Sequence, residues 1–233
     1  MSTKRIFYYE VARFFIYGYS ELMMNVDVQF HSDLPKGPKI FVANHPSASD
    51  GFLLHRVHRM SILITASAFA FPVFGAFVRG CGQIPVAPGS NASERAVELL
   101  RAGKSVGIFP EGTYSPQTGG FGIARHGASR VALKTGAPVI PVGISLRREF
   151  CIWLKSKIIG RETAGLWYPF GPYVVTVGNP MAFQGDPRDD HLVASTTSLI
   201  MDQITSLADE SRCRMRARWM PSKPAHIGQP GSD

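Results

Sequence analysis

Two polar clusters, each following a short apolar run, contain the residues of this chain best suited to do chemistry. His45 and Asp50 follow the run 40–43, and Glu111 follows the run 106–109 within the order Pro-Glu-Gly-Thr. Each apolar run predicts a buried strand, and in an open α/β sheet ligands bind where such strands end. The two clusters therefore predict one crevice in which these side chains meet.

The pair His45 and Asp50 is suited to moving a proton. Neutral imidazole accepts a proton near pH 7, and a carboxylate that accepts the Nδ1–H bond leaves Nε2 as the base. Pro46 is favoured in the first turn of a helix, so we expect a helix over about 46–58 with Asp50 one turn in. The sequence has no G-x-S-x-G motif, so the base should act on a substrate hydroxyl. A helix-capping or structural histidine is the alternative.

A resemblance to a known family extends this pattern. The segment Asn44–Asp50, NHPSASD, resembles the Asn-His-x-x-x-x-Asp signature of the glycerolipid acyltransferase family, the 1-acylglycerol-3-phosphate acyltransferase-like proteins. Further segments resemble the later family blocks in the same order: GQIPV at 82–86, FPEGTYS at 109–115, RHGA at 125–128 and VIPVGI at 139–144. The resemblance spans residues 25–180, which is most of the chain.

The resemblance implies acyl transfer from an acyl-thioester to a hydroxyl of a lysophospholipid or related lipid acceptor. Acyl-CoA or acyl carrier protein would be the co-substrate, with no other cofactor. His45 would be the general base and Asp50 the group that orients it. The substrate site would include the following residues: Asn44, Glu111, Gly112, Thr113 and Arg125. A thioester is already activated, so a base and oxyanion donors suffice for this reaction.

Two positions depart from the family pattern. The family commonly has arginines where Pro88 and Tyr114 stand in this chain. Those arginines are thought to bind the acceptor phosphate, for which the planar guanidinium fork is well suited. Pro88 has no donor and Tyr114 has one hydroxyl. Either Arg79, Arg125 or Arg130 compensates, or the acceptor carries no phosphate.

Other functions remain compatible with the same residues. A thioester hydrolase would use water in place of the acceptor, and a non-catalytic protein would only bind lipid or CoA. The net charge of +8 favours anionic partners such as phospholipid headgroups and CoA phosphates. The sequence shows no nucleic-acid-binding module, so we expect no nucleic-acid partner.

The cysteines and histidines indicate which redox and metal chemistry the chain can support. Three cysteines are scattered without a C-x-x-C spacing, which favours a reducing compartment and buried thiols. His55 and His58 lie close to the motif, but a metal site needs a third ligand, and none has suitable spacing. We therefore predict no metal and expect both histidines on the exposed side of the motif helix.

The alternation of predicted strands and helices indicates an α/β fold, with a mostly parallel central sheet flanked by helices. The predicted strands are 25–30 (an edge strand), 39–43, 62–64, 83–86, 106–109, 139–144 and 173–177. The other predicted helices are 91–102, 126–135 and 190–219. Residues 61–78 carry no charge, but Pro72 and Gly75 argue against a membrane span there.

The domain organisation is expected to be simple. Residues 1–24 should form a helix that either packs on the sheet or lies in a membrane interface. Residues 25–220 should form one acyltransferase domain, and residues 221–233 a disordered tail. We expect peripheral association with the cytoplasmic face of a membrane. Four arginines near the end of the last helix would either favour the helix dipole or bind anionic headgroups: Arg212, Arg214, Arg216 and Arg218.

Overall fold

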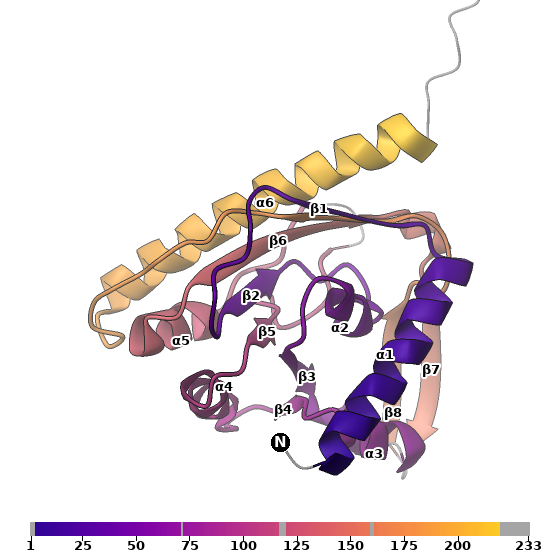
Figure 1. The fold of residues 1–233 in the computed structure, drawn as a ribbon, viewed down its shortest axis with the longest axis horizontal. Helices are drawn as coiled ribbons and strands as arrows, with labels where there is room; N and C mark the ends of the chain where they lie inside the picture. Colours follow the sequence, from indigo (N-terminus) through magenta and orange to yellow (C-terminus); the bar gives the residue numbers. More distant parts are fainter. Residues whose placement is uncertain (1–2, 71, 117–119, 159–160, 220–233) are drawn as a thin grey trace, which may run out of the picture.

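The computed structural model describes residues 3–70, 72–116, 120–158 and 161–219. Its centre is a seven-stranded sheet (Figure 1) with the order β1-β9-β6-β2-β5-β3-β4. The strands are β1 (Val26–Phe30), β2 (Ile40–Ala43), β3 (Ser61–Thr65), β4 (Ile84–Val86), β5 (Val106–Ile108), β6 (Val139–Leu146) and β9 (Tyr173–Val177). All neighbouring strands are parallel except β6 and β9. The predicted fold class, a mostly parallel α/β sheet, is confirmed.

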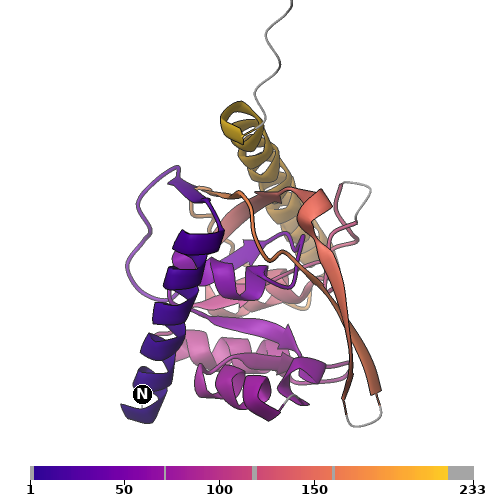
Figure 2. The ribbon, with the colours of Figure 1, turned by 90° about the vertical axis from the view of Figure 1, so that its right-hand side faces the viewer.

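Helices cover both faces of this sheet (Figures 1 and 2). They are α1 (Thr3–Met23), α2 (Asp50–Leu53), α3 (Pro72–Gly80), α4 (Ala92–Arg101), α5 (Gly127–Thr135) and α6 (Asp190–Trp219). Strand β2 shows why two layers form, because its side chains alternate between the faces. Phe41 packs in the cluster that contains Leu53 after the motif, whereas Ile40 packs in the cluster of α4, α5 and α6. All of β2 is therefore buried, as is usual for a central parallel strand.

The long helix α6 lies across β6 and β9 at very short distance (Figure 1). Gly143 of β6 makes this approach possible, because a Cβ there would lie 2.1 Å from the backbone nitrogen of Ala208. Ser211 then donates a hydrogen bond of 2.9 Å to the Gly143 carbonyl. These contacts fix the C-terminal helix α6 to strand β6.

A hairpin that the sequence did not predict stands apart from the main sheet. Strands β7 (Ile152–Ile158) and β8 (Arg161–Trp167) pair antiparallel and form a separate two-stranded sheet. Figure 2 shows the hairpin along one side of the molecule and α1 along the other side of the same face. The segment shows no alternation of apolar and polar residues, and both faces of its first strand are partly exposed at 152–154.

The motif helix is shorter than predicted. The expected helix over 46–58 begins only at Asp50, and a 3₁₀ turn, Leu54–Arg56, follows α2. The Asp50 side chain accepts the Ser47 N–H at 2.8 Å, and the Asp50 N–H donates to the Ser47 carbonyl. This tight turn replaces the first helical turn, so Pro46 is not at a helix start.

Two expectations about single side chains are wrong. His55 is buried rather than exposed, at 8% accessible surface. Cys213 is exposed, whereas Cys81 and Cys151 are partly buried, and burial raises the pKa of both thiols to about 11. Of the four arginines near the end of the last helix, Arg214 donates to Asp27 and to the Val175 carbonyl.

Within the part of the chain that the structure describes, no helix has the length and apolar character needed to cross a membrane. The uncharged segment 61–78 forms β3, which includes the strand predicted at 62–64, then a 3₁₀ turn and α3. The predicted tail, 221–233, lies outside the described residues.

Candidate active site

His45 and Asp50 meet at the carboxyl end of β2. The Nδ1 atom of His45 lies 3.0 Å from Oδ2 of Asp50. The Asp50 side chain is fully buried, and the His45 side chain is 17% exposed. The imidazole therefore sits at the boundary between the core and the surface, which is where a base can reach both its partner and a substrate.

Asp50 is held by more donors than His45 alone. The Ser47 N–H and hydroxyl donate to its two oxygens at 2.8 and 3.1 Å. The Tyr173 hydroxyl donates to Oδ1 at 2.8 Å. A buried charge is costly unless hydrogen bonds satisfy it, and this carboxylate has four donors. Its orientation, and through it that of His45, is thus tightly fixed.

Tyr173 is a site residue that sequence reasoning missed. It lies in β9, 123 positions after Asp50, and no motif marks it. Burial, followed by the charge of Asp50, raises the pKa of Tyr173 well above its usual value. The phenol therefore stays protonated and remains a donor to Asp50 across the pH range of an assay.

Asn44 joins the ends of two strands. Its amide donates to the Ile144 carbonyl at 2.9 Å, and its side-chain oxygen accepts the Ile144 N–H at 2.7 Å. The residue is 4% exposed. Asn44 thus fixes the end of β2 to β6 directly before His45, with its side-chain donor and acceptor both engaged.

Glu111 holds the loop after β5 against the His45 segment. Its Oε1 accepts bonds from the His45 N–H at 3.2 Å and from the Ser115 hydroxyl at 2.6 Å. Its Oε2 accepts the Gly122 N–H at 2.6 Å. Ser115 in turn donates its N–H to the His45 carbonyl. Glu111 is only 3% exposed, and its hydrogen bonds hold the two motif segments together. We call this set of hydrogen bonds the Glu111 clasp.

Gly112, Thr113 and Arg125 lie at the surface beside this clasp, and all three are exposed. Gly112 has a positive φ of 63°, and a Cβ there would lie 2.8 Å from Nε of Arg125. The guanidinium of Arg125 therefore lies across Gly112, where a side chain would displace it. The arrangement offers a cation next to the Glu-Gly-Thr turn.

The other two candidate arginines are engaged elsewhere. Arg79 donates to the Phe69 carbonyl at 2.7 Å. Arg130 donates to the Pro187 carbonyl and to Asp190. Of the three arginines that the sequence suggested, Arg125 alone has a described contact with the motif segments. Sequence reasoning did not single out Arg148, which donates to the Pro116 carbonyl on the loop after Glu111.

Aromatic rings surround His45. Phe109 stacks on the imidazole at 4.0 Å between ring centres, and Tyr114 lies tilted at 4.8 Å. Trp153 of the hairpin meets Tyr114 edge-on at 6.1 Å. Burial raises the pKa of Tyr114, while a hydrogen bond to the Leu166 backbone opposes that rise. Phe109 and Tyr114 thus lie against His45, and Trp153 lies behind Tyr114.

The hairpin also supports the motif turn directly. The Ala48 N–H donates to the Leu166 carbonyl at 2.6 Å. The Ser49 hydroxyl donates to the Tyr168 carbonyl at 2.9 Å. The turn between His45 and Asp50 is therefore held from three sides: by Asp50 itself, by the Glu111 clasp and by the end of β8.

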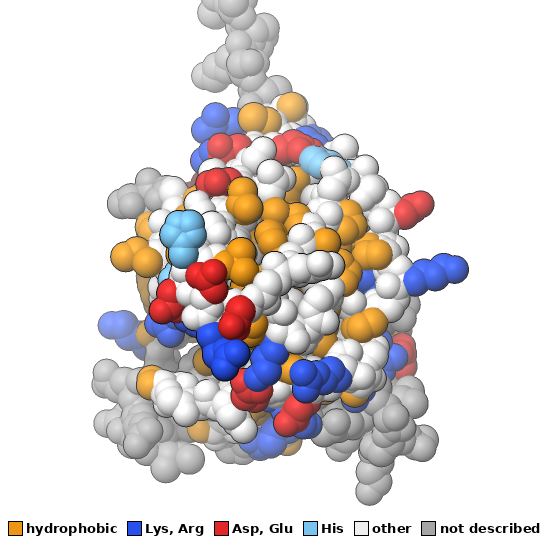
Figure 3. Space-filling model, turned by 90° about the vertical axis from the view of Figure 1, so that its left-hand side faces the viewer, with side chains coloured by type: hydrophobic (Ala, Val, Ile, Leu, Met, Phe, Trp, Pro, Cys, Tyr) orange, Lys and Arg blue, Asp and Glu red, His pale blue; other side chains and the backbone are white. Residues whose placement is uncertain are grey.

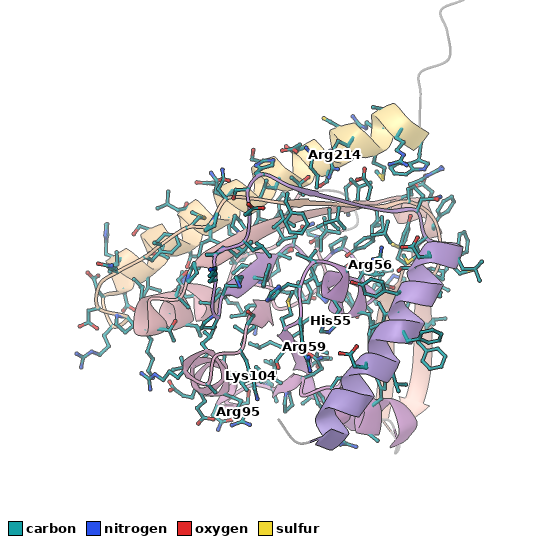
Figure 4. The ribbon with its side chains drawn as sticks, in the orientation of Figure 1. His55, Arg56, Arg59, Arg95, Lys104 and Arg214 are labelled. Carbon is teal, nitrogen blue, oxygen red and sulfur yellow. The ribbon has the colours of Figure 1, made fainter. Side chains whose placement is uncertain are left out.

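The charged residues around the site have mostly structural partners. Figure 4 shows Arg56, which follows α2, close to α1, and Arg214 between α6 and the sheet. Arg56 donates to Glu21 at 2.6 Å and lies 4.1 Å above the Tyr17 ring. Among the residues that the structure describes, no group of three or more His, Cys, Asp or Glu side chains is placed to hold a metal ion.

Comparison with known proteins gives the class. A family model described as "Acyltransferase" matches residues 25–145, just over half of the 233 residues. The chain belongs to this acyltransferase family, and the match includes both motif segments and β6 up to Ser145.

Individual relatives refine the picture. A 1-acyl-sn-glycerol-3-phosphate acyltransferase from Brassica napus is 35% identical over 50% of this chain and 36% of the relative. A lyso-ornithine lipid O-acyltransferase from Pseudomonas aeruginosa is 34% identical over 58% of this chain and 54% of the relative. The chain thus matches only about a third to a half of the length of these two relatives.

A solved structure shares the fold. The 1-acyl-sn-glycerophosphate (LPA) acyltransferase PlsC from Thermotoga maritima superposes with a TM-score of 0.66 at 24% identity. The alignment covers 93% of this chain and 81% of PlsC. The seven-stranded sheet with its helices is therefore a PlsC-like fold.

Proposed function

We propose that this chain transfers a fatty acyl group from an acyl-thioester to a hydroxyl of a lysolipid, with His45 as general base. The observation that carries the proposal is the 3.0 Å contact between His45 Nδ1 and the buried Asp50 carboxylate. It selects the tautomer with a proton on Nδ1 and a lone pair on Nε2. Membership of the acyltransferase family supports the reaction type.

The steps follow from this tautomer. Nε2 of His45 takes the proton of the acceptor hydroxyl as its oxygen attacks the thioester carbonyl carbon. Asp50 stabilises the imidazolium that forms. The tetrahedral intermediate collapses with cleavage of the carbon–sulfur bond, and the imidazolium returns its proton to the departing thiolate. The products are the acylated lipid and the free thiol of CoA or acyl carrier protein.

The predicted substrate residues divide into two groups in this proposal. Gly112, Thr113 and Arg125 are exposed beside the site and are proposed to contact the acceptor. Asn44 and Glu111 are buried and fully engaged with the backbone. We expect these two to position the motif segments rather than to touch substrate.

The acceptor is proposed to be a lysolipid without a phosphate monoester. Tyr114 packs between His45 and Trp153, where the family commonly has an arginine, and Pro88 provides no donor. Arg125 is left to bind an anionic group. The two relatives are named for lysophosphatidic acid-type and lyso-ornithine lipid acceptors, and an ornithine headgroup carries no phosphate.

We also propose that the acyltransferase domain extends to about residue 220, beyond the family match, because β9 supplies Tyr173 and α6 packs on β6. The protein should work as a peripheral protein on the cytoplasmic face of a membrane, where a lipid acceptor and CoA meet. Phe14 and Leu22 of α1 are 74% and 83% exposed, which suits contact with lipid.

The test is acyl transfer from labelled palmitoyl-CoA to a panel of lysolipids that includes lysophosphatidic acid and lyso-ornithine lipid. His45→Ala is the blank. New acylated lipid with the wild type and none with the blank supports the proposal, and preference for lyso-ornithine lipid supports the phosphate-free acceptor. Free fatty acid without new lipid would indicate a thioester hydrolase. Equal transfer by wild type and blank would show that His45 is not the general base, and neither transfer nor hydrolysis by the wild type would leave only lipid binding.

A further inference from the structure

The β7–β8 hairpin presents apolar side chains that the described part of the fold covers only in part. Ile152, Trp153 and Leu154 are consecutive in β7 and are 44%, 55% and 51% exposed. Successive strand residues point to opposite faces, so both faces of the hairpin expose apolar surface. We call these three residues the apolar stretch.

The surroundings differ on the opposite side of the molecule. Figure 3 shows that face, and Lys, Arg, Asp and Glu side chains lie interspersed in its lower half. Ion pairs such as Lys134–Glu94 and Arg130–Asp190 link α5 to its neighbours α4 and α6. The charged lower half of that face is typical of exposure to water, although its central part also shows apolar side chains. Three adjacent half-exposed apolar side chains on one hairpin call for a partner.

The two-sided exposure favours lipid over a protein partner. A protein surface docks on one face of a ribbon, whereas a lipid layer surrounds both. Lys155, next in the strand, is exposed and can extend its ammonium to headgroup phosphates while its stem stays among apolar groups. Tryptophan and lysine are both suited to the membrane interface. The net charge of +8 adds attraction to anionic lipid.

The hairpin can enter only the interfacial layer. Among the described strands, β7 and β8 pair only with each other, so their outer edges carry backbone groups that need water or headgroups. In hydrocarbon those unpaired groups would be costly. The depth of contact is thereby limited to the headgroup region.

The apolar stretch adjoins the candidate active site. Trp153 contacts Tyr114, and Tyr114 lies 4.8 Å from His45. A lipid layer against the hairpin would therefore lie beside the imidazole, and a lysolipid would reach it without crossing water.

We propose that the β7–β8 hairpin is a lipid-contact element. It places Ile152, Trp153 and Leu154 in the headgroup region of a membrane and holds the His45 site against it. The delivery of a lysolipid rests on the proposed function, but the membrane contact does not.

The test measures binding to vesicles of phosphatidylcholine alone, without acyl donor, because this headgroup has no net charge and gives an introduced lysine no net attraction. Leu154→Lys should weaken binding about tenfold or more, because a half-exposed leucine gives up its apolar contact. Leu199→Lys is the matched control, since Leu199 of α6 is 53% exposed and lies outside the hairpin. The control should bind as the wild type does. Unchanged binding of Leu154→Lys, or equal losses in both variants, would overturn the proposal.

Two further measurements keep the result interpretable if Leu154→Lys folds poorly. The chain has three tryptophans, and lipids brominated near the headgroup should quench wild-type fluorescence but quench Trp153→Phe much less. Equal quenching in both would contradict the proposal. Light scattering without lipid gives the oligomeric state, and a dimer that Leu154→Lys dissociates would show that the hairpin binds a second copy instead.

The proposed function is tested separately by His45→Ala. This variant should bind vesicles as the wild type does while acyl transfer is lost. If His45→Ala abolishes transfer but Leu154→Lys binds vesicles normally, the function stands and the lipid-contact element is wrong. If Leu154→Lys alone loses binding and the wild type itself shows no transfer, the lipid-contact element stands and the proposed function is wrong.

Discussion

At the scale of single residues, the candidate site depends on how the Asp50 carboxylate is held. Tyr173 donates to Asp50 Oδ1, whereas the equally buried Tyr168 donates its hydroxyl to the Pro172 carbonyl. The two tyrosines therefore form a comparable pair: both hydroxyls donate a buried hydrogen bond, but only Tyr173 reaches the proposed base through Asp50.

We expect Tyr173→Phe to lower kcat several-fold with little change in KM, because Asp50 and hence His45 lose a fixed orientation. Tyr168→Phe should leave kcat unchanged. Each variant should lose about 1–2 kcal/mol of unfolding free energy, the usual cost of a buried hydrogen bond. Steady-state kinetics and urea unfolding measure both quantities. Equal effects of the two variants on kcat would show that Tyr173 has only a structural role.

His55 gives the protein a pH-dependent stability. Burial, and then the Arg59 charge, lower the pKa of His55 from 6.5 to about 4. Between these values the unfolded chain binds a proton that the folded chain does not, so stability falls as the pH drops through this window. The contribution is fully present above pH 6.5, and the loss of unfolding free energy reaches about 3 kcal/mol once the pH falls below the folded value.

Urea unfolding of wild type and His55→Gln at neutral pH and at roughly pH 4.5 checks this expectation. The wild type should lose about 2–3 kcal/mol more than the variant between the two conditions. His191→Gln is the control, because His191 of α6 is exposed. If wild type and His55→Gln have the same pH dependence, His55 is protonated in the folded state.

At the scale of elements, the loop after β5 is held by one carboxylate. Glu111→Gln keeps the size of the side chain but turns one acceptor oxygen into an NH₂ group. That NH₂ group is a donor, and it would face other donors: either the Gly122 N–H, or the His45 N–H and the Ser115 hydroxyl. An unsatisfied buried donor costs about 1–3 kcal/mol, so we expect this loss in stability and faster hydrogen exchange in the loop.

Activity should fall about tenfold or more with Glu111→Gln, since a misplaced site residue far from the bond-making step can cost that much. Glu149→Gln is the control, because Glu149 is exposed and pairs with Arg147 at the surface. It should change neither exchange nor activity. Full activity of Glu111→Gln together with normal loop protection would contradict the clasp.

Elements with strong local patterns were predictable, and elements defined by distant contacts were not. The bounds of β9 (Tyr173–Val177) and α6 (Asp190–Trp219) agree with the prediction. There the periodicity of apolar residues ends at the same positions as the residues that terminate a strand or helix. The hairpin was missed because its residues show no alternation of apolar and polar side chains. The motif helix was placed too early because the Asp50 side chain takes the Ser47 N–H and a turn replaces the first helical turn.

The candidate site divides in the same way. His45 and Asp50 were predicted to meet, and the 3.0 Å contact confirms that they do. Tyr173, which donates to Asp50, and the hairpin residue Trp153, which contacts Tyr114, come from strands far along the chain, and only the fold brings them near. His55 was expected on a helix exterior, but the short motif helix turns it into the core.

At the scale of the whole molecule, α1 is joined to the motif region by polar contacts. Arg56 follows α2 and reaches α1 (Figure 4). Its guanidinium donates to Glu21 and lies over Tyr17, while its side chain is 17% exposed. The C-terminal end of α1 has a second attachment, since the Gly171 N–H donates to the Met23 carbonyl. Because Arg56 lies six positions after Asp50, a movement of α1 on a membrane would also displace residues close to the site.

Arg56→Met tests whether this contact holds α1 in place. Methionine keeps much of the apolar stem but loses the ion pair and the cation–π contact. These are worth about 1–2 kcal/mol together, since Glu21 is largely exposed. Arg95→Met removes an exposed pair with Glu98 on α4 and should be neutral. We expect faster hydrogen exchange throughout α1 in Arg56→Met only, with the central strands unchanged. If α1 keeps its protection, its apolar face and the Met23 attachment hold it without Arg56, and the proposed link between α1 and the Asp50 turn is lost.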